Sequence, residues 1–327
     1  MTTSSDSRTA PAPAGETWRD LVRLDSPTEE RNPRTRDLDT LGEEELVARI
    51  LAEDATVVAA VQAQSGALAA LAARCVETID GGGTVHYVGA GTSGRLGVLD
   101  AVELVPTYNA TEDMVTAHLA GGPEAMMRAV EGAEDDPEGG ARVVRQQCTA
   151  ADLVIGLAAS GRTPFVRGAL QQARDLGAGT ALIAANPRAP LAEIADIAVL
   201  LDVGPEVVTG STRMKAATAQ KIALNTLSTA TMVRLGTTYE NLMIDVRPTN
   251  EKLVARTVRM LVQATGRSTE DAAAMLEDAG GSVRVALVAL LAGVDAATAA
   301  PAVARHAKDP DRIGDPAGIR TAVEELR

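Results

Sequence analysis

Short apolar runs alternate with amphipathic stretches along the central part of the chain. Five runs have the length of buried strands and lie at residues 84–88, 115–119, 153–158, 180–185 and 197–201. Between them, apolar residues recur at helical spacing in four stretches, 94–103, 123–131, 164–175 and 190–195. Strands and helices that alternate in this way are typical of a parallel sheet with helices on both faces. The pattern therefore predicts an α/β fold.

On either side of this region the apolar spacing is helical only. Residues 41–79 are predicted to be helical up to the glycine turn at 81–83. Residues 211–235, rich in Ala, Thr and Leu, are predicted to form a long helix. Helices are thus expected to flank the alternating region on both sides.

The last part of the chain carries the start signals of several short helices. Ser268 and Asp271 form a capping-box pattern, and the apolar run 283–292 follows a glycine pair. Asp295 is placed to open a third helix. We therefore expect a compact three-helix unit at 267–308.

Composition divides the chain into three parts. Residues 1–25 begin with a stretch rich in Ser, Thr, Ala and Pro that lacks the apolar core of a signal peptide, and we expect a disordered leader there. Residues 26–250 hold the α/β pattern behind an N-terminal helical arm, and 251–327 are predicted to form a C-terminal helical domain. Because no run of about 18 apolar residues occurs, no membrane span is expected, and the expected location is the cytoplasm.

The composition argues against several classes of partner and cofactor. Aromatic residues make up 2% of the chain and the formal net charge is −13, which disfavours nucleic acid and anionic membrane surfaces. The three histidines lie far apart in sequence and no Cys/His ligand spacing occurs, so no metal site is expected. Cys75 and Cys148 are expected to be buried thiols in a cytosolic protein.

Two glycine-hydroxyl loops carry the strongest functional signal. Residues 89–95 (Gly-Ala-Gly-Thr-Ser-Gly-Arg) follow the first predicted strand, and 159–164 (Ala-Ser-Gly-Arg-Thr-Pro) follow the third. A strand that ends in such a loop and opens a helix presents free backbone N–H groups and the positive end of a helix dipole to an anion. The first loop also fits a dinucleotide pattern, but its Thr92 and Ser93 suit a terminal phosphate or sugar hydroxyls better. The two loops together predict a phosphorylated small molecule as ligand.

Glu103 is the carboxylate that the helical spacing places near the first loop. Ser93, Leu96, Asp100 and Glu103 share one predicted helical face. Ten residues of straight helix span about 15 Å, which is long for one sugar phosphate. Three arrangements resolve this: the helix breaks near Ala101, the phosphate sits mainly on the Ser160 loop, or a second subunit contributes. An exposed glutamate without a role is the plain alternative.

Three further segments are compatible with a site but also with ordinary surface. Glu134 lies in the acidic cluster 131–136, which by itself reads as solvated surface. The loop 204–215 contains Ser211 and leads into the long predicted helix, so it offers either an anion contact or a helix cap. Lys252 is either a ligand contact or a solvated lysine.

A resemblance to one family covers the chain from about residue 26 to residue 308. The matching motifs are 28–33, 89–97, 131–135, 159–164, 209–215 and 241–243. They closely resemble the N-acetylmuramic acid 6-phosphate etherases, which are sugar isomerase (SIS) domain proteins similar to the glucokinase regulatory protein. The resemblance implies a SIS-type, flavodoxin-like sandwich with a small C-terminal three-helix unit. It also implies a homodimeric lyase that uses no cofactor and cleaves the D-lactyl ether of a phosphosugar in cell-wall recycling.

The resemblance also implies roles for individual residues. Glu103 matches the acid/base residue of the family, and Glu134 matches the second catalytic glutamate, expected to assist ring opening. Ser93, Ser160 and Thr163 match hydroxyls that bind sugar phosphates. The expected substrate-binding set is Gly91, Thr92, Ser93, Ser160, Gly161, Arg162, Thr163, Ser211 and Lys252.

One motif departs from the family pattern, and two other functions compete. The family reads Asp-Ala-Ser-Glu-Cys-Pro-Pro-Thr where residues 100–107 read Asp-Ala-Val-Glu-Leu-Val-Pro-Thr. These apolar neighbours are expected to raise the pKa of Glu103 by desolvation or to shift substrate preference. A sugar-phosphate sensor is disfavoured because both glutamates are present. An aldose–ketose isomerase is disfavoured by the etherase-like segments 204–215 and 241–252.

Overall fold

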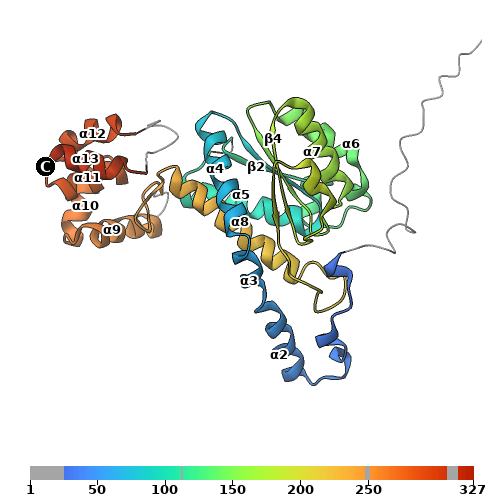
Figure 1. Ribbon diagram of the computed structural model, residues 1–327. Helices are drawn as coiled ribbons and strands as arrows, with labels where there is room; N and C mark the ends of the chain where they lie inside the picture. The colour runs from blue at the N-terminus through green and yellow to red at the C-terminus, as the bar shows by residue number, and fades with distance from the viewer. Residues whose placement is uncertain (1–25, 112, 247–250, 308–315) are drawn as a thin grey trace, which may run out of the picture.

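A five-stranded parallel sheet forms the centre of the larger part of the molecule in this computed structural model, which describes residues 26–111, 113–246, 251–307 and 316–327 (Figure 1). The strand order is β2-β1-β3-β4-β5, and every neighbouring pair is parallel. All five predicted strands are confirmed to within one residue at each end. Their bounds are β1 (Val85–Gly89), β2 (Val115–Leu119), β3 (Leu153–Leu157), β4 (Gly179–Ala184) and β5 (Ile197–Leu200).

Helices cover both faces of the sheet, as the alternating pattern predicts. One face packs against α4 (Ser65–Asp80), α5 (Gly91–Tyr108) and α8 (Lys215–Arg234). The other packs against α6 (Pro137–Gln147) and α7 (Pro164–Leu176). Because β1 and β3 are buried on both faces, they read in sequence as continuous apolar runs and not as alternating ones. The predicted α/β class is confirmed.

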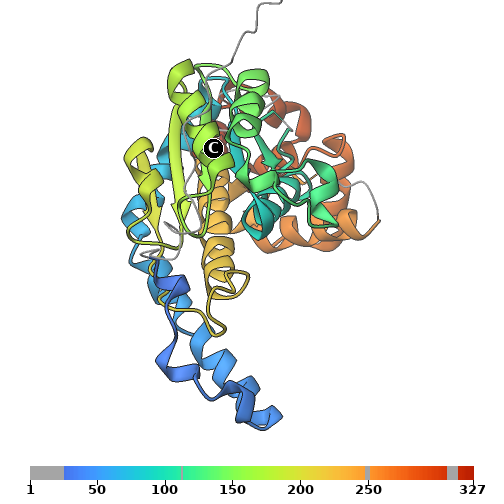
Figure 2. The same ribbon diagram turned by 90° about the vertical axis from the view of Figure 1, so that its right-hand side faces the viewer.

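The predicted helix at 41–79 is three helices. They are α2 (Glu43–Asp54), α3 (Val57–Gln62) and α4, and α4 is bent by 60° from the α2–α3 pair. At the first break the Thr56 hydroxyl donates to the carbonyl oxygen of Glu53 (2.8 Å), a local bond that competes with the helical ladder. Helices α2 and α3 extend away from the sheet (Figures 1 and 2).

Two of the short predicted helices are single turns of 3₁₀ helix. They are η4 (Pro123–Met126) within the predicted 123–131 and η6 (Pro190–Ile194) within 190–195. Each begins at a proline, which fixes φ at the first position. Each segment is also too short to form a stable α-helix.

Helix α6 was not predicted, although its start signal is present in the sequence. The Asp136 side chain accepts a hydrogen bond from the Gly139 N–H (2.9 Å), and Pro137 occupies the first helical position. The acidic cluster 131–136 therefore has a structural role, because its last residue, Asp136, caps α6.

The long predicted helix begins four residues late, at Lys215. The Glu206 carboxylate accepts hydrogen bonds from the N–H groups of Lys215 and Ala216, both at 2.9 Å. A carboxylate nine residues upstream thus caps the start of α8. The residues between Glu206 and Lys215 form a loop at the end of the sheet instead of a first helical turn.

The C-terminal helices share a core of their own, and α10 to α12 pack together as predicted (Figure 1). The side chains of Ser268 and Asp295 cap their helices by accepting from the N–H groups of Asp271 and Thr298. The elements are α9 (Glu251–Thr265), α10 (Thr269–Asp278), α11 (Val283–Ala292), α12 (Ala296–Arg305) and α13 (Gly318–Leu326). The leader predicted at 1–25 and the domain boundary at 250 lie outside the described residues.

No single helix within the described ranges is both long and apolar enough to cross a bilayer, although two bent helix pairs pass on length and composition alone. Cys75 and Cys148 are both free and buried, as expected. No group of three or more His, Cys, Asp or Glu side chains in the described part of the chain is arranged to hold a metal ion.

Candidate active site

The strand order places both glycine-hydroxyl loops at one point of the sheet. β1 lies between β2 and β3, so the chain leaves β1 toward one side and β3 toward the other. In open α/β sheets the carboxyl ends of two such strands form the crevice in which ligands bind. A cavity of about 360 Å³ lies here, between the loop after β1 and the loop after β3.

Six of the residues predicted from sequence line this cavity. Gly91, Thr92 and Ser93 come from the first loop, Ser160 and Thr163 from the second, and Glu134 from the acidic cluster. The cavity is also lined by Glu29, Ala90, Leu157, Ala158, Ala159 and Thr212. No lysine or arginine is among these lining residues of the described chain. An anion would therefore be held by hydroxyls, backbone N–H groups and helix dipoles.

Close backbone packing fixes the first loop. A Cβ on Gly94 would lie 2.5 Å from the Gly89 carbonyl oxygen, so only glycine lets α5 begin directly against the end of β1. Gly91 supports the sharp turn with φ of +52°. From α8, the Gln220 side chain donates to the Ser93 carbonyl oxygen (2.9 Å). The first-turn N–H groups of α5, which have no partner within the helix, are thereby held beside the cavity.

The second loop is fixed from the neighbouring strand. The Asn186 side chain, just after β4, donates to the Ser160 carbonyl oxygen (3.1 Å), and the Ser160 hydroxyl accepts from the Arg162 N–H (3.3 Å). Gly161 has φ of +66° and packs against Ala189. Thr163 is the residue before α7, so its hydroxyl lies at a helix N-terminus.

Glu134 lies where two cavities meet. It belongs to the short turn η5 (Ala133–Asp135), which follows Gly132 with φ of +73°. Besides the main cavity, it lines an adjoining one of about 250 Å³ that also contains Arg95. The structure thus brings Glu134 to the first loop, although the two are about forty positions apart in sequence.

Glu103 does not reach the cavity of its own chain. Helix α5 continues without a break from Gly91 to Tyr108, so the expected break near Ala101 does not occur. At 1.5 Å per residue, Ser93 and Glu103 are separated by about 15 Å along the helix. Glu103 is exposed, whereas Asp100 on the same predicted face is buried. Two of the three expected arrangements therefore remain: the phosphate binds mainly at the Ser160 loop, or a second subunit contributes to the site.

The apolar neighbours of Glu103 do not bury it either. Leu104 packs into the core, but Val102 and Val105 are 60% and 45% exposed, and Leu99 one turn earlier is 50% exposed. The desolvation of Glu103 expected from these residues is therefore absent in the single chain. Instead, α5 presents an exposed apolar surface around a carboxylate.

Four other predicted residues lie outside the cavity lining. Gly161 and Arg162 lie within the second loop but contribute no lining surface. Ser211 is half-buried in the loop before α8, where its neighbour Thr212 lines the cavity instead. Lys252 is exposed at the start of α9. The sequence motif located this third loop but not the hydroxyl within it that reaches the cavity.

Glu29 is the charged lining residue that the sequence motifs did not indicate. It belongs to η1 (Pro27–Glu29), inside the motif 28–33 that carried the family resemblance. That motif was the available signal, but nothing in the local pattern indicates that it reaches the end of the sheet.

A buried polar cluster around Asp100 holds α5 in place beside the cavity. Asp100 accepts hydrogen bonds from Asn225 (2.7 Å), Ser228 (3.0 Å) and the Tyr87 hydroxyl (3.2 Å), which joins α5, α8 and β1. Burial raises the pKa of Asp100, and these hydrogen bonds oppose the rise. The cluster fixes the helix whose first turn carries Thr92 and Ser93.

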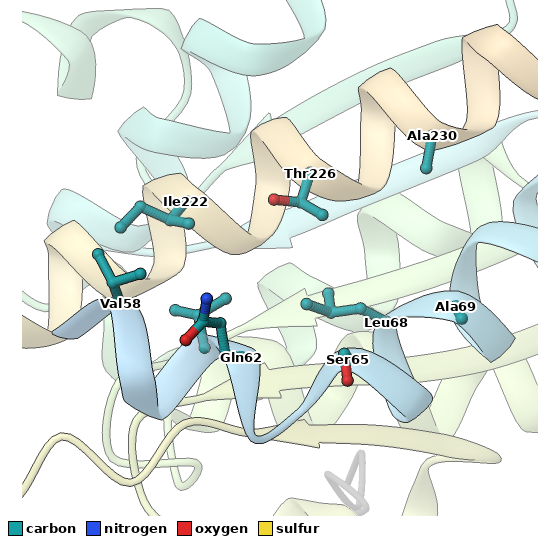
Figure 3. Close-up of a pocket in the computed structure, with 9 residues that line it drawn as sticks. Val58, Gln62, Ser65, Leu68, Ala69, Ile222, Thr226 and Ala230 are labelled. Atoms are coloured by element: carbon teal, nitrogen blue, oxygen red, sulfur yellow. The ribbon is translucent and has the colours of Figure 1, made fainter.

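A separate pocket, of about 300 Å³, lies between α3, α4 and α8, away from these two cavities (Figure 3). Its lining is largely apolar and includes Val58, Leu68 and Ile222, and none of the lining residues is titratable. It has no glycine-hydroxyl loop, and the helix N-terminus at its edge contributes Ser65 with no charged side chain beside it among the lining residues. It therefore lacks the chemistry that a phosphosugar requires, and the site remains at the carboxyl ends of β1 and β3.

The sheet order and the hydroxyl loops after β1 and β3 are those of a SIS domain, and family models identify this class. The family model for the glucokinase regulatory protein N-terminal SIS domain matches residues 67–174, and the SIS domain model matches 137–230. A putative phosphosugar isomerase from Bacteroides fragilis aligns with a TM-score of 0.48 at 22% identity, covering 61% of this chain and 94% of that one.

Closer relatives identify the family within this class. The N-acetylmuramic acid 6-phosphate etherase of Symbiobacterium thermophilum is 51% identical over 82% of this chain and 89% of its own length. That of Thermobifida fusca is 51% identical over 83% and 88%, and that of an Enterobacter species 48% over 85% and 94%. The chain therefore belongs to the N-acetylmuramic acid 6-phosphate etherase family, which confirms the resemblance found in the sequence.

Proposed function

We propose that this protein cleaves the D-lactyl ether of N-acetylmuramate 6-phosphate to N-acetylglucosamine 6-phosphate and D-lactate. The observation that carries the proposal is one cavity that combines two phosphate-type loops with the Glu134 carboxylate. The names and high identity of the relatives supply the substrate. By the same resemblance, the reaction belongs to N-acetylmuramate catabolism and peptidoglycan recycling in the cytoplasm.

The proposed reaction needs a base and an acid and no cofactor. When the sugar ring opens, C1 becomes an aldehyde and the C2 proton becomes acidic. A carboxylate removes this proton, the C2–C3 double bond forms, and the C3–O bond breaks while an acid protonates the departing lactate oxygen. Water then adds to C3 of the unsaturated aldehyde, and C2 takes up a proton. Carboxyl groups perform both transfers if their pKa values lie near the working pH.

The phosphate is proposed to bind mainly at the second loop. Ser160 and Thr163 provide hydroxyls beside the N-terminus of α7, and a phosphate there would be stabilised by the helix dipole. Thr92 and Ser93 would then lie nearer the sugar. This arrangement leaves Glu134, between the loops, to act on the ring.

Glu103 is proposed to act in the cavity of a second subunit. The family resemblance assigns it the acid/base role, yet in its own chain α5 carries it away from the cavity. The apolar side chains of Leu99, Val102 and Val105 on the same helix offer a surface for a second copy. Exposed Val47 and Leu51 on α2 are further apolar surface that a homodimer would cover.

The test is incubation with N-acetylmuramate 6-phosphate and an assay for D-lactate. We expect lactate release by the wild type and loss of most of it in Glu134→Gln, with sugar-phosphate binding retained. Binding of the substrate without lactate release by the wild type would replace the etherase with a sugar-phosphate sensor. Ketose formation from a 2-hydroxy aldose phosphate such as glucose 6-phosphate, again without lactate, would replace it with an isomerase.

A further inference from the structure

Besides Glu134, one other carboxylate lines the cavity, and it comes from an unexpected part of the chain. Glu29 belongs to the segment before α2, yet it lies with Ser160, Thr163 and Thr212 around the same space. In the described part of the chain no hydrogen bond or ion pair engages its side chain. A carboxylate that is directed to an anion-binding cavity and has no cation beside it is available for a ligand.

The backbone around Glu29 is fixed by the loop before α8. The Gly210 N–H donates to the Thr28 carbonyl oxygen (3.0 Å), and the Glu29 N–H donates to the Ser26 carbonyl oxygen (3.0 Å). The hydroxyls of Ser26 and Thr28, both buried, are 3.0 Å apart. Glu29 is thus the exposed end of a short turn whose other residues are packed into the protein.

Gly210 leaves the space that the Glu29 side chain occupies. A Cβ at position 210 would lie 3.0 Å from Glu29 Oε2, and the φ of Gly210 is +76°, which favours glycine. The carboxylate therefore packs directly over backbone at the edge of the cavity. A glycine here serves both the turn and the approach of the carboxylate.

The residues after Glu29 anchor the segment to the body of the protein. Asn32 donates from Nδ2 to Glu53 Oε2 (2.9 Å) and to the Pro205 carbonyl oxygen (3.3 Å). Thr35 donates from its hydroxyl to the Val207 carbonyl oxygen (2.8 Å). Contacts on both sides of Glu29 thus end on the loop before α8, so hydrogen bonds to this loop set the position of Glu29 relative to Thr212.

We infer that Glu29 is a substrate-binding residue that accepts a hydrogen bond from an O–H or N–H group on the sugar portion of the ligand. A carboxylate repels phosphate, so it selects ligands that present a donor at one end and the phosphate at the other. Because the lining of the cavity otherwise offers mainly hydroxyls and backbone, Glu29 supplies the strongest acceptor besides Glu134. This inference rests on the proposed phosphosugar function.

The experiment compares three ligands on Glu29→Gln and Glu29→Asp. Competition or calorimetry would give dissociation constants for N-acetylglucosamine 6-phosphate, glucose 6-phosphate and inorganic phosphate. We expect Glu29→Gln to raise the dissociation constant of N-acetylglucosamine 6-phosphate by about 10- to 100-fold, as for loss of a hydrogen bond to a charged group. Inorganic phosphate should bind as tightly as before or more tightly, because a repelling charge is removed. Glu29→Asp should weaken the binding of the sugar phosphate and leave the binding of inorganic phosphate unchanged.

The two sugars distinguish the donor. If the binding of glucose 6-phosphate is weakened equally, the donor is a hydroxyl. If only the binding of the acetamido sugar is weakened, the donor is its N–H. Glu30→Gln is the matched control, because it removes the same charge from the next residue, which is exposed and does not line the cavity. Unchanged sugar-phosphate binding in Glu29→Gln, or equal weakening of all three ligands, would overturn the inference. Wild-type lactate release, measured first, tests the proposed function separately.

Discussion

Lys215 Nζ lies 3.2 Å from Glu53 Oε2, and the two side chains are 0% and 4% exposed. This buried ion pair joins α8 to the end of α2, and Arg34 adds two further hydrogen bonds to the same carboxylate. The pair therefore lies at the junction of the N-terminal segment, the helical arm and the helix that follows the site loop. Its charges are satisfied only when all three are in place.

Loss of the Glu53 charge should destabilise the fold strongly. Glu53→Gln leaves Lys215 buried beside a neutral side chain, so we expect the free energy of unfolding to fall by about 3–5 kcal/mol. Chemical denaturation measures this change. The matched control is Glu77→Gln, which removes an exposed pair with Arg74 and should cost less than about 1 kcal/mol. Similar losses in both variants would contradict a special role for the buried pair.

The same carboxylate predicts acid sensitivity. The hydrogen bonds from Arg34, followed by those from Asn32 and Lys215, lower the pKa of Glu53 from 4.5 to about 2 against the opposing effect of burial. The folded state thus binds the proton less readily than the unfolded chain does. Its contribution to stability is complete above pH 4.5 and is lost as the pH falls toward 2. Glu53→Gln should flatten the fall of Tm in this window.

A second acid-sensitive pair lies between β1 and β2. His86 Nδ1 and His118 Nε2 are 2.9 Å apart with stacked rings, and burial, then the neighbouring His86, lowers the pKa of His118 from 6.5 to about 4. The folded state therefore favours neutral His118, and stability is lost as the pH falls from 6.5 toward 4. His118→Gln should reduce the slope of Tm against pH between these values. An unchanged slope would show that His118 does not titrate this way.

Ser160→Ala should weaken the binding of the substrate phosphate. Removal of one hydroxyl hydrogen bond to a dianion is expected to raise KM by about 10- to 100-fold while kcat changes less. Steady-state lactate release measures both constants. Ser65→Ala, in the apolar pocket away from the site, is the control and should leave both unchanged. A loss confined to kcat would move the phosphate away from the second loop.

A shared site predicts complementation between two inactive variants. Glu103→Gln and Glu134→Gln should each be inactive alone as homodimers. In a mixed dimer, one cavity would receive intact Glu134 from its own chain and intact Glu103 from the other. After random reassembly of equal amounts we expect about a quarter of the wild-type rate. No recovery, with mixed dimers verified by mass spectrometry, would place both glutamates in the same subunit's site.

The sequence predicts most of the sheet and the two main loops, because both are local patterns. Buried parallel strands such as β3 leave continuous apolar runs, and the chain must turn through Gly91 and Gly161 directly after such strands. The start of α6 was overlooked because its Asp136–Pro137 cap lies within a cluster of charges that resembles surface.

The remaining features of the site depend on contacts that periodicity does not encode. Helical spacing gives the direction of Glu103 around α5 but not the distance to the loop. Glu29 reaches the cavity through a hydrogen bond between Thr28 and Gly210, which are far apart in sequence. Such contacts follow only from the assembled fold.

The anchoring of the N-terminal segment has a consequence for biosynthesis. Thr35 is 172 residues away from its acceptor at Val207, so the segment around Glu29 leaves the ribosome long before the loop to which it binds. At 5–20 residues per second, this delay is on the order of ten to thirty seconds. Throughout it, the residues around Glu29 lack their hydrogen-bond partners in the loop before α8. The cavity is therefore completed late, and a nascent chain cannot acquire the full site before α8 emerges.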